Sequence, residues 1–172
     1  MLIRTLKKER KNLWTFKQIV KLGFGGIKMI HKASKNDIRL IANLAVLLWD
    51  DNSVDALADE FSELLSKDDA QIFLKYEDDI PVGFAQCQLR YDYVEGTETT
   101  PVGYLEGLFI LENYRNRGYA KELLNKCEMW AKDKGCKEFA SDCEIDNNIS
   151  FQFHKAMHFT EANRIICFTK KL

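Results

Sequence analysis

The chain has 172 residues, of which 46% are apolar and 30% charged, a composition typical of one folded domain with a sizeable core. The net charge of −1 is uneven: residues 1–28 hold eight Lys or Arg and one acid, so residues 29–172 hold 17 basic and 25 acidic side chains, a net of −8. An acidic body argues against nucleic acid as the main partner. It suits a cationic substrate, or acids that simply keep the protein in solution.

The cysteines and histidines predict neither disulfides nor a metal site. The five cysteines are odd in number and form no Cys-x-x-Cys pair, which favours free thiols in a reducing cytoplasm. His31, His154 and His158 lack zinc-ligand spacing with the cysteines. No apolar run is long enough to cross a membrane, and no secretory signal is recognised.

Residues 1–28 differ from the rest of the chain, and they end in Gly23-Phe24-Gly25-Gly26. Three interpretations compete: a dispensable basic extension, which we favour, a basic amphipathic helix that contacts a membrane or partner, and an extra element packed on the domain. Residues 29–172 are predicted to form a single domain.

The expected elements from Met29 onward follow the order βααβββαβαβ. Helix caps are expected at Ser34 or Asn36 and at Ser53 or Asp55. Periodicity predicts strands at 29–33, 70–76, 80–90, 102–111 and 138–142, with one or two closing strands within 159–170; helices are expected at about 34–48, 53–65, 118–133 and 147–157. The predicted fold is therefore α/β (α+β), with about four helices and a mixed, mainly antiparallel sheet of six to seven strands.

The central segment, Tyr104–Ala120, combines a strand, a basic turn and the start of a helix. The first N–H groups of a helix have no intrahelical partner, and the helix dipole is positive there, so this junction is an anion site. Gly118 allows a ligand to approach the backbone, and Arg115 and Arg117 add charge. A diphosphate would suit this turn, which is neither a Walker loop nor a dinucleotide fingerprint.

Arg115-x-x-Gly118-x-Ala120 after an apolar strand resembles the acyl-CoA loop of the GCN5-related N-acetyltransferases, and the order of elements matches as well. The resemblance implies acetyl-CoA as co-substrate, no metal, and a splay between the fourth and fifth strands through which the thioester reaches. It places the following residues at the cofactor: Leu108, Phe109, Ile110, Arg115, Asn116, Arg117, Gly118, Tyr119, Ala120, Lys121 and Asn147.

Within the same resemblance, the segment that begins at Asn147 matches a motif in which a tyrosine often serves as general acid. His154 stands at that position. A histidine there could protonate the leaving thiolate or could be a packed, hydrogen-bonded residue.

Three further segments are similar to the bacterial aminoglycoside 6'-N-acetyltransferases: Arg90–Gly96, Leu105–Ile110 and Ala140–Asp142. This closer resemblance implies substrate contacts by Trp49, Asn52, Tyr93, Glu106, Asp142 and Asn163, and a homodimer. Asn52 and Asn163 differ in type from the residues expected there, and Asn163 stands where an acid is expected.

Acetyl transfer requires an uncharged amine, so a carboxylate must accept its proton. Glu106 and Asp142 are the candidates, although Glu106 could be a buried structural acid and Asp142 a helix cap. Trp49 and Tyr93 could stack on sugar rings or simply pack. A cleft edged by acids would attract a polycation; these acids are Asp50, Asp51, Glu95, Glu98, Glu106 and Asp142.

The resemblance therefore predicts a cytoplasmic enzyme that acetylates the 6'-amine of an aminoglycoside by direct attack in a ternary complex, giving antibiotic resistance. Two alternatives remain open. One is an acetyltransferase of the same fold for a polyamine or a protein N-terminus. The other is a non-catalytic module that binds acyl-CoA or the drug.

Overall fold

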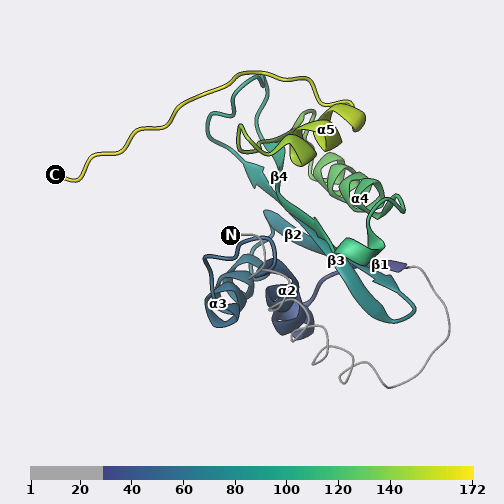
Figure 1. Cartoon of the computed structure of the whole chain (residues 1–172). Coiled ribbons are helices and arrows are strands. Elements are labelled where there is room, and N and C mark those ends of the chain that lie inside the picture. The colour runs from purple at the N-terminus through teal and green to yellow at the C-terminus, as the bar shows by residue number, and fades with distance from the viewer. Residues whose placement is uncertain (1–28) are drawn as a thin grey trace.

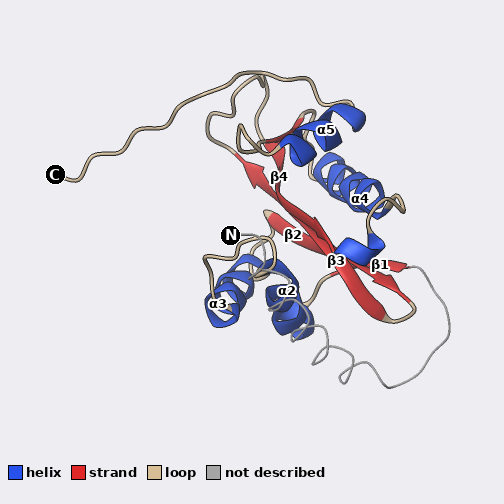
Figure 2. Cartoon of the chain, viewed as in Figure 1, coloured by secondary structure: helices blue, strands red, loops and turns tan. Residues whose placement is uncertain are grey.

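The computed structural model describes residues 29–172, so the predicted extension at residues 1–28 lies outside the described residues. The described chain forms a five-stranded sheet in the order β1-β2-β3-β4-β5, with helices on both faces (Figure 1, Figure 2). The strands are β1 Met29–Lys32, β2 Ala70–Glu77, β3 Ile80–Arg90, β4 Val102–Ile110 and β5 Phe139–Ser141. The helices are α2 Ile38–Ala45, α3 Val54–Leu64, α4 Tyr119–Asp133 and α5 Asn148–Ala156, with short 3-10 turns η1 Lys35–Asp37 and η2 Glu112–Tyr114.

Two serines decide where the first helical segments begin. The Ser34 side chain accepts a hydrogen bond from the Asn36 N–H, and Asp37 accepts one from the Ser34 N–H, which together form a capping box ahead of α2. Ser53 caps α3 by accepting from the Ala56 N–H at 3.1 Å. Of the alternative caps predicted from the sequence, the serines are the ones used.

The sheet separates two apolar cores. On one face α2 and α3 cover a core that includes the fully buried Ile41, Phe61 and Phe84. On the other face α4 covers a core that includes Leu123 and Cys127. Strand residues alternate between these cores because successive side chains of a strand point to opposite faces.

The prediction of one or two closing strands within residues 159–170 is wrong, and the sheet has five strands instead of six or seven. Residues 160–172, here called the C-terminal tail, are exposed; they pass Gly96 at Ala162 and then extend away from the body without joining the sheet (Figure 2). Ile165, Ile166 and Phe168 are branched or aromatic, which favours a strand. Strand propensity alone does not form a strand, which also needs pairing with a neighbour, and the tail pairs with none of the five strands described, including β5 at the edge of the sheet.

The predicted splay between β4 and β5 is confirmed. Strands β1 to β4 pair antiparallel, whereas β4 and β5 pair parallel, and only from Gly103↔Phe139 to Leu105↔Ser141. Beyond this point residues 106–110 of β4 have no strand partner on the β5 side. The β3–β4 register also shifts here, which leaves Glu106 as an extra residue in β4. The pairing therefore ends and the strand bulges at the same place.

Candidate active site

The gap beside β4 exposes a length of backbone to any ligand that enters it. Leu108, Phe109 and Ile110, predicted to lie along the cofactor, form the end of β4 past its last pair with β5. Their backbone groups on that side have no strand to bond with, and such groups need some partner. The geometry suits an extended ligand that adds its own polar groups along the strand edge.

The loop after β4 delivers the N-terminus of α4 to the same end of the sheet. Asn116 and Gly118 adopt positive φ values of 59° and 82°, which turn the chain sharply into the helix. Gly118 is the N-cap and no side chain caps α4, so the helix end is left to bind an anion. A Cβ at Gly118 would meet nothing within 4 Å, so the glycine is required by its backbone conformation and not by crowding.

The charged and aromatic side chains around this loop are engaged within the protein. Arg115 Nε donates to the Ile110 carbonyl at 3.0 Å. Arg117 donates to both Glu77 carboxylate oxygens at 3.1 Å, and the buried Tyr119 donates its hydroxyl to Glu77 at 2.7 Å. These residues therefore shape the loop, and anion binding falls mainly to backbone N–H groups.

A second polar cluster lies on the α3 side of the sheet, at the other end of the splay. Arg90 donates from Nε and Nη2 to the two Glu106 oxygens at 3.1 and 2.9 Å, and its guanidinium lies 3.3 Å from the Tyr104 ring centroid. The Asp142 carboxylate lies near the Tyr104 hydroxyl and acts on its pKa. Burial and the Asp142 charge raise the pKa of Tyr104 to about 12, so this hydroxyl stays protonated near neutral pH.

The two predicted proton acceptors therefore differ in their surroundings. Both Glu106 oxygens accept from Arg90, which leaves few positions for a substrate amine. Asp142 follows β5 directly, is exposed, lies near Tyr104 and takes part in none of the ion pairs of residues 29–172. Asp142 is better placed to accept a proton, and Glu106 is better placed to supply fixed negative charge.

Trp49 lies beside the bulge, as its predicted role in the site requires. A Cβ added to Gly107 would lie 2.6 Å from the Trp49 ring, so the indole covers the backbone next to Glu106. The ring also packs against Phe84 with 5.9 Å between centroids. Trp49 therefore belongs both to the core under α2 and to the edge of the site.

The other predicted substrate contacts are exposed and more peripheral. Tyr93 is 80% exposed and donates its hydroxyl to Glu95 at 2.8 Å. Asn52 lies in the turn after Trp49, and Asn163 lies in the C-terminal tail. The tail touches the loop that carries Tyr93, since a Cβ on Gly96 would lie 2.4 Å from that of Ala162. Substrate contact by these three residues stays a prediction.

His154 and Asn147 have structural partners. His154 Nδ1 lies 2.7 Å from the Ser150 carbonyl oxygen, while its buried Nε2 has no partner in residues 29–172. The ring meets Phe159 edge-on. Asn147 accepts from the Ser150 N–H at 3.0 Å and so caps α5. The packed interpretation of His154 has geometric support; its role as an acid, and the cofactor contact of Asn147, stay predictions.

Comparison with known proteins agrees with this geometry. The model of the acetyltransferase (GNAT) family matches residues 23–159. The chain belongs to the acetyltransferase (GNAT) family. It is 36% identical over 142 residues to an aminoglycoside N(6')-acetyltransferase type 1 of Salmonella enteritidis, covering 83% of this chain and 98% of that protein. It is 40% identical over 130 residues to a protein of the same name from Acinetobacter genomosp. 13, covering 75% and 88%.

Solved structures give the same result for the fold of this acetyltransferase. AAC(6')-Iy bound to the bisubstrate analogue CoA-S-monomethyl-acetylneamine superposes with a TM-score of 0.81 at 35% identity, covering 85% of this chain and 99% of that one. AAC(6')-Iy in complex with CoA gives a TM-score of 0.83 at 34% identity, covering 88% and 99%. The predicted acetyltransferase fold and family are thereby confirmed.

Sequence reasoning gave no role in this acetyltransferase to Arg90 and Tyr104, which organise the two carboxylates. A signal was present: Gln86, Gln88 and Arg90 occupy alternate positions of an otherwise apolar strand, so they share one face. Polar side chains at every second position indicate a strand face that is not fully covered. Their pairing with β4 depended on a bulge, which the sequence did not reveal.

The described residues of this acetyltransferase form neither a candidate metal site nor a helix suited to a membrane. Within residues 29–172, no three His, Cys, Asp or Glu side chains come together in a way that could hold a metal ion. None of the helices in that range is both long and apolar enough to pass through a membrane. All five cysteines are free; Cys87, Cys127 and Cys136 are buried, while Cys143 and Cys167 are exposed.

Proposed function

We propose that the protein transfers the acetyl group of acetyl-CoA to the 6'-amino group of an aminoglycoside and thereby confers resistance. One observation carries the proposal: the splay of β4 and β5 joins an uncapped helix N-terminus to a carboxylate cluster across a single strand. The names of the relatives, and the CoA and bisubstrate complexes of AAC(6')-Iy, support the same reaction.

The reaction needs three things from this chain. Asp142 accepts a proton from the substrate ammonium, so that the free amine attacks the thioester carbonyl carbon. Backbone N–H groups at the end of β4 stabilise the oxyanion, and the C–S bond then breaks. The departing thiolate takes up a proton, for which His154 is the candidate donor. Attack is direct, in a ternary complex, with no acyl-enzyme.

The experiment is a thiol-release assay with acetyl-CoA and four amines in parallel: kanamycin, tobramycin, spermidine and a short peptide. Release with the two aminoglycosides alone is expected. Release only with spermidine or the peptide would keep the fold and co-substrate but replace the antibiotic. Binding of acetyl-CoA without release in the presence of any of the four amines would favour a non-catalytic binding module.

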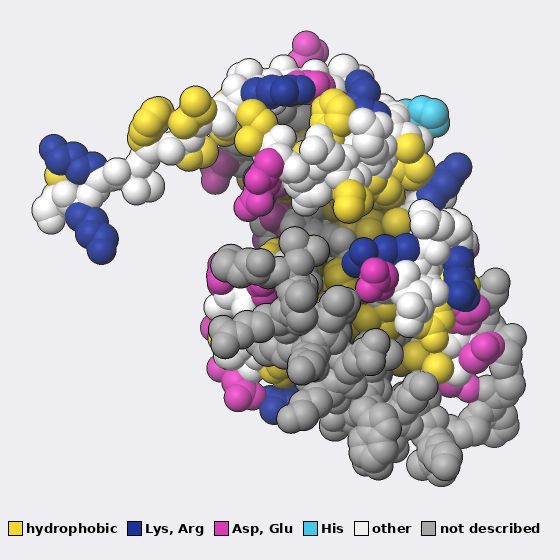
Figure 3. Space-filling model, in the orientation of Figure 1, with side chains coloured by type: hydrophobic (Ala, Val, Ile, Leu, Met, Phe, Trp, Pro, Cys, Tyr) yellow, Lys and Arg dark blue, Asp and Glu magenta, His cyan; other side chains and the backbone are white. Residues whose placement is uncertain are grey.

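We also propose that the enzyme is a homodimer. The C-terminal tail leaves Ile165, Ile166 and Phe168 between 68% and 88% exposed, and Figure 3 shows apolar side chains along this tail, away from the body. A second copy would cover them. Sedimentation of the full chain should give a dimer, and Ile166→Asp with Phe168→Asp should shift it toward monomer. A wild-type monomer would overturn the proposal.

Two further parts of the proposal concern location and the N-terminal segment. The five free cysteines support a reducing cytoplasm. Residues 1–28 are proposed to be dispensable for the single domain formed by residues 29–172, because their basic composition, eight Lys or Arg against one acid, differs from that of the acidic remainder of the chain. A protein that starts at Met29 should retain full turnover, and sedimentation with anionic vesicles should show no loss of binding relative to the full chain.

A further inference from the structure

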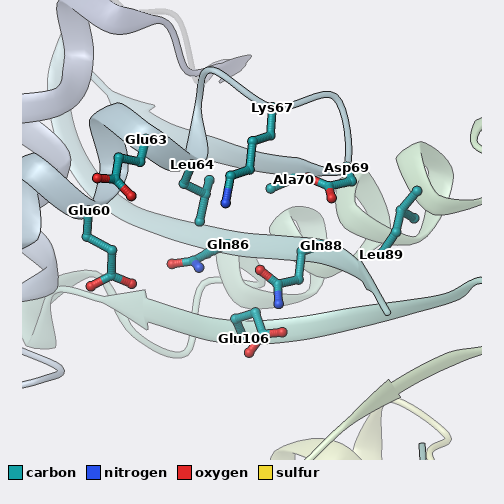
Figure 4. A pocket seen from close by; sticks show the side chains of 10 residues that line it. All are labelled: Glu60, Glu63, Leu64, Lys67, Asp69, Ala70, Gln86, Gln88, Leu89 and Glu106. Carbon is teal, nitrogen blue, oxygen red and sulfur yellow. The ribbon is translucent and has the colours of Figure 1, made fainter. Parts of the chain in front are cut away.

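A pocket of about 390 Å³ lies between the end of α3 and the open face of β2, β3 and β4 (Figure 4). This volume is within the range of small-molecule sites. One cation, Lys67, lines the pocket. Four carboxylates line it as well: Glu60, Glu63, Asp69 and Glu106. Glu106 is also held by Arg90 in the candidate active site, so the pocket borders that site.

Three of these carboxylates are uncompensated in the described structure. The ion pairs among residues 29–172 do not include Glu60, Glu63 or Asp69, and the hydrogen bond that Ser66 donates to Glu63 goes to its backbone carbonyl and not to its carboxylate. Glu60 and Glu63 come from α3, and Asp69 directly precedes β2, so the fold brings two elements together here. Lys67 is the one cation among the lining residues, so the pocket has an excess of negative charge in a concave site.

Gln86 provides a second, independent observation. Within residues 29–172 it is one of three buried polar or charged residues, together with Gln71 and Lys75. Gln71 donates to the Ile72 carbonyl and Lys75 pairs with Glu122, but Gln86 Oε1 has no partner among the described residues. Gln86 is 5% exposed and lines the pocket, where its amide points toward Glu60 (Figure 4). Buried amide oxygens without a donor are uncommon, because leaving one unpaired is costly.

We propose that this pocket is a second ammonium subsite, which binds an amino group of the substrate other than the one that is acetylated. The Gln86 amide and the pocket carboxylates accept hydrogen bonds from that ammonium, while Glu106 links the pocket to the reacting amine. The inference rests on the proposed function, since it assigns a place to the remaining positive charge of a polyamine sugar. It predicts that affinity grows with the number of ammonium groups that reach the pocket.

The test measures binding of neamine, and of its analogue with a 6'-hydroxyl in place of the 6'-amine, by titration calorimetry with CoA present. The analogue is not acetylated at that position, so its affinity reports the pocket independently of turnover. The variants are Glu60→Gln with Glu63→Gln, and separately Gln86→Met. The matched control is Asp59→Asn with Asp68→Asn, which removes the same charge from exposed positions that do not line the pocket.

The Glu60/Glu63 variant should weaken both ligands about tenfold, with the control within twofold and the Km for acetyl-CoA unchanged. Gln86→Met should weaken them severalfold while leaving the melting temperature equal or higher, because it removes an unpaired buried oxygen. A Gln86 with a purely structural role would lower the melting temperature instead.

If the wild-type protein acetylates neamine but the variants bind both ligands with unchanged affinity, the subsite is overturned and the proposed function stays intact. Tight analogue binding that depends on Glu60 and Glu63, without any acetylation of neamine, would instead keep the subsite and overturn the proposed function.

Discussion

The two ends of the β4 splay are built on opposite principles. At the α4 end, Arg115, Arg117 and Tyr119 use their side chains to hold the loop, so backbone N–H groups are left to meet the ligand. At the α3 end, the proposed recognition falls to side chains: Glu106 is paired with Arg90, and Asp142 lies near Tyr104. One strand thus separates a backbone site from a side-chain site.

This difference fits the ligands proposed for each end. A diphosphate is one fixed anion, and a helix N-terminus meets it through backbone geometry alone. A polyamine differs from drug to drug in where its charges lie, and side chains can be exchanged without disturbing the backbone. Substitutions at the α4 end should therefore change the Km for acetyl-CoA, and substitutions at the α3 end should change turnover and the Km for the amine.

The largest effect is expected for Asp142→Asn, which removes the proposed proton acceptor. Turnover of the aminoglycoside should fall about 100-fold, as is usual for the loss of a general base, and its binding should weaken. Affinity for acetyl-CoA should stay the same. The control is Glu144→Gln, an exposed carboxylate two residues away. The measurement is steady-state kinetics with both substrates varied. If Asp142→Asn behaved like Glu144→Gln, Asp142 would not be the proton acceptor.

The next effect is expected for Gly118→Ala at the backbone site. Gly118 has a φ of 82°, which costs an alanine about 1–2 kcal/mol and displaces the start of α4. The Km for acetyl-CoA should rise about tenfold with that for the amine unchanged. Gly135→Ala is the matched control: its φ is 92°, it follows the other end of α4, and it too has open space around it. An equal rise in both variants would contradict a specific role for Gly118.

A smaller effect is expected for Arg90→Gln. Glu106, whose side chain is 19% exposed, would lose its bidentate partner, at a cost of about 1–3 kcal/mol. The melting temperature should drop by several degrees and the amine Km should change severalfold. Arg39→Gln breaks a pair with Asp55 whose side chains are 69% and 79% exposed, and should change stability by less than about 1 kcal/mol. Calorimetry measures both melting temperatures. A larger loss of stability in Arg39→Gln than in Arg90→Gln would show that Arg90 has no structural role.

The smallest effect is expected for Tyr104→Phe, which should lower turnover about twofold. The pKa of Tyr104 is raised to about 12, so between pH 10 and 12 the unfolded chain loses this proton while the native state keeps it. Stability from this group is full below pH 10 and lost as pH rises through 12. Tyr104→Phe should therefore make the fall in stability above pH 10 shallower.

Tyr76 supplies the control for that experiment. Burial also raises its pKa to about 12, so Tyr76→Phe should change the alkaline stability profile in the same direction without altering turnover. Denaturant unfolding from pH 9 to 12 measures the profile, and a Tyr104→Phe curve that matches wild type would mean that the phenol is not buried as described.

Much of this molecule could be predicted from short stretches of sequence. Caps at Ser34 and Ser53, the apolar periodicity of α4 and the strand–turn–helix around Gly118 are local features, decided by residues within a few positions of one another. The carboxylates at the site were also found, because Glu106 and Asp142 lie at a splay expected from a family resemblance. The tail was mispredicted, because a strand needs a partner that local propensity does not supply.

Other features depended on contacts between distant segments. The bulge at Glu106 exists only where β3 and β4 are paired, and it is this register that brings Arg90 onto Glu106 and Tyr104. The acidic pocket combines α3 with β2, β3 and β4, and Gln86 is unpaired only because of what surrounds it. The sequence by itself determined the order of elements from β1 to α5 and the turn at Gly118, since both rest on local hydrogen bonds and periodicity. Only the tertiary structure decided which charges are paired and which face a ligand, since pairing depends on strand register and burial.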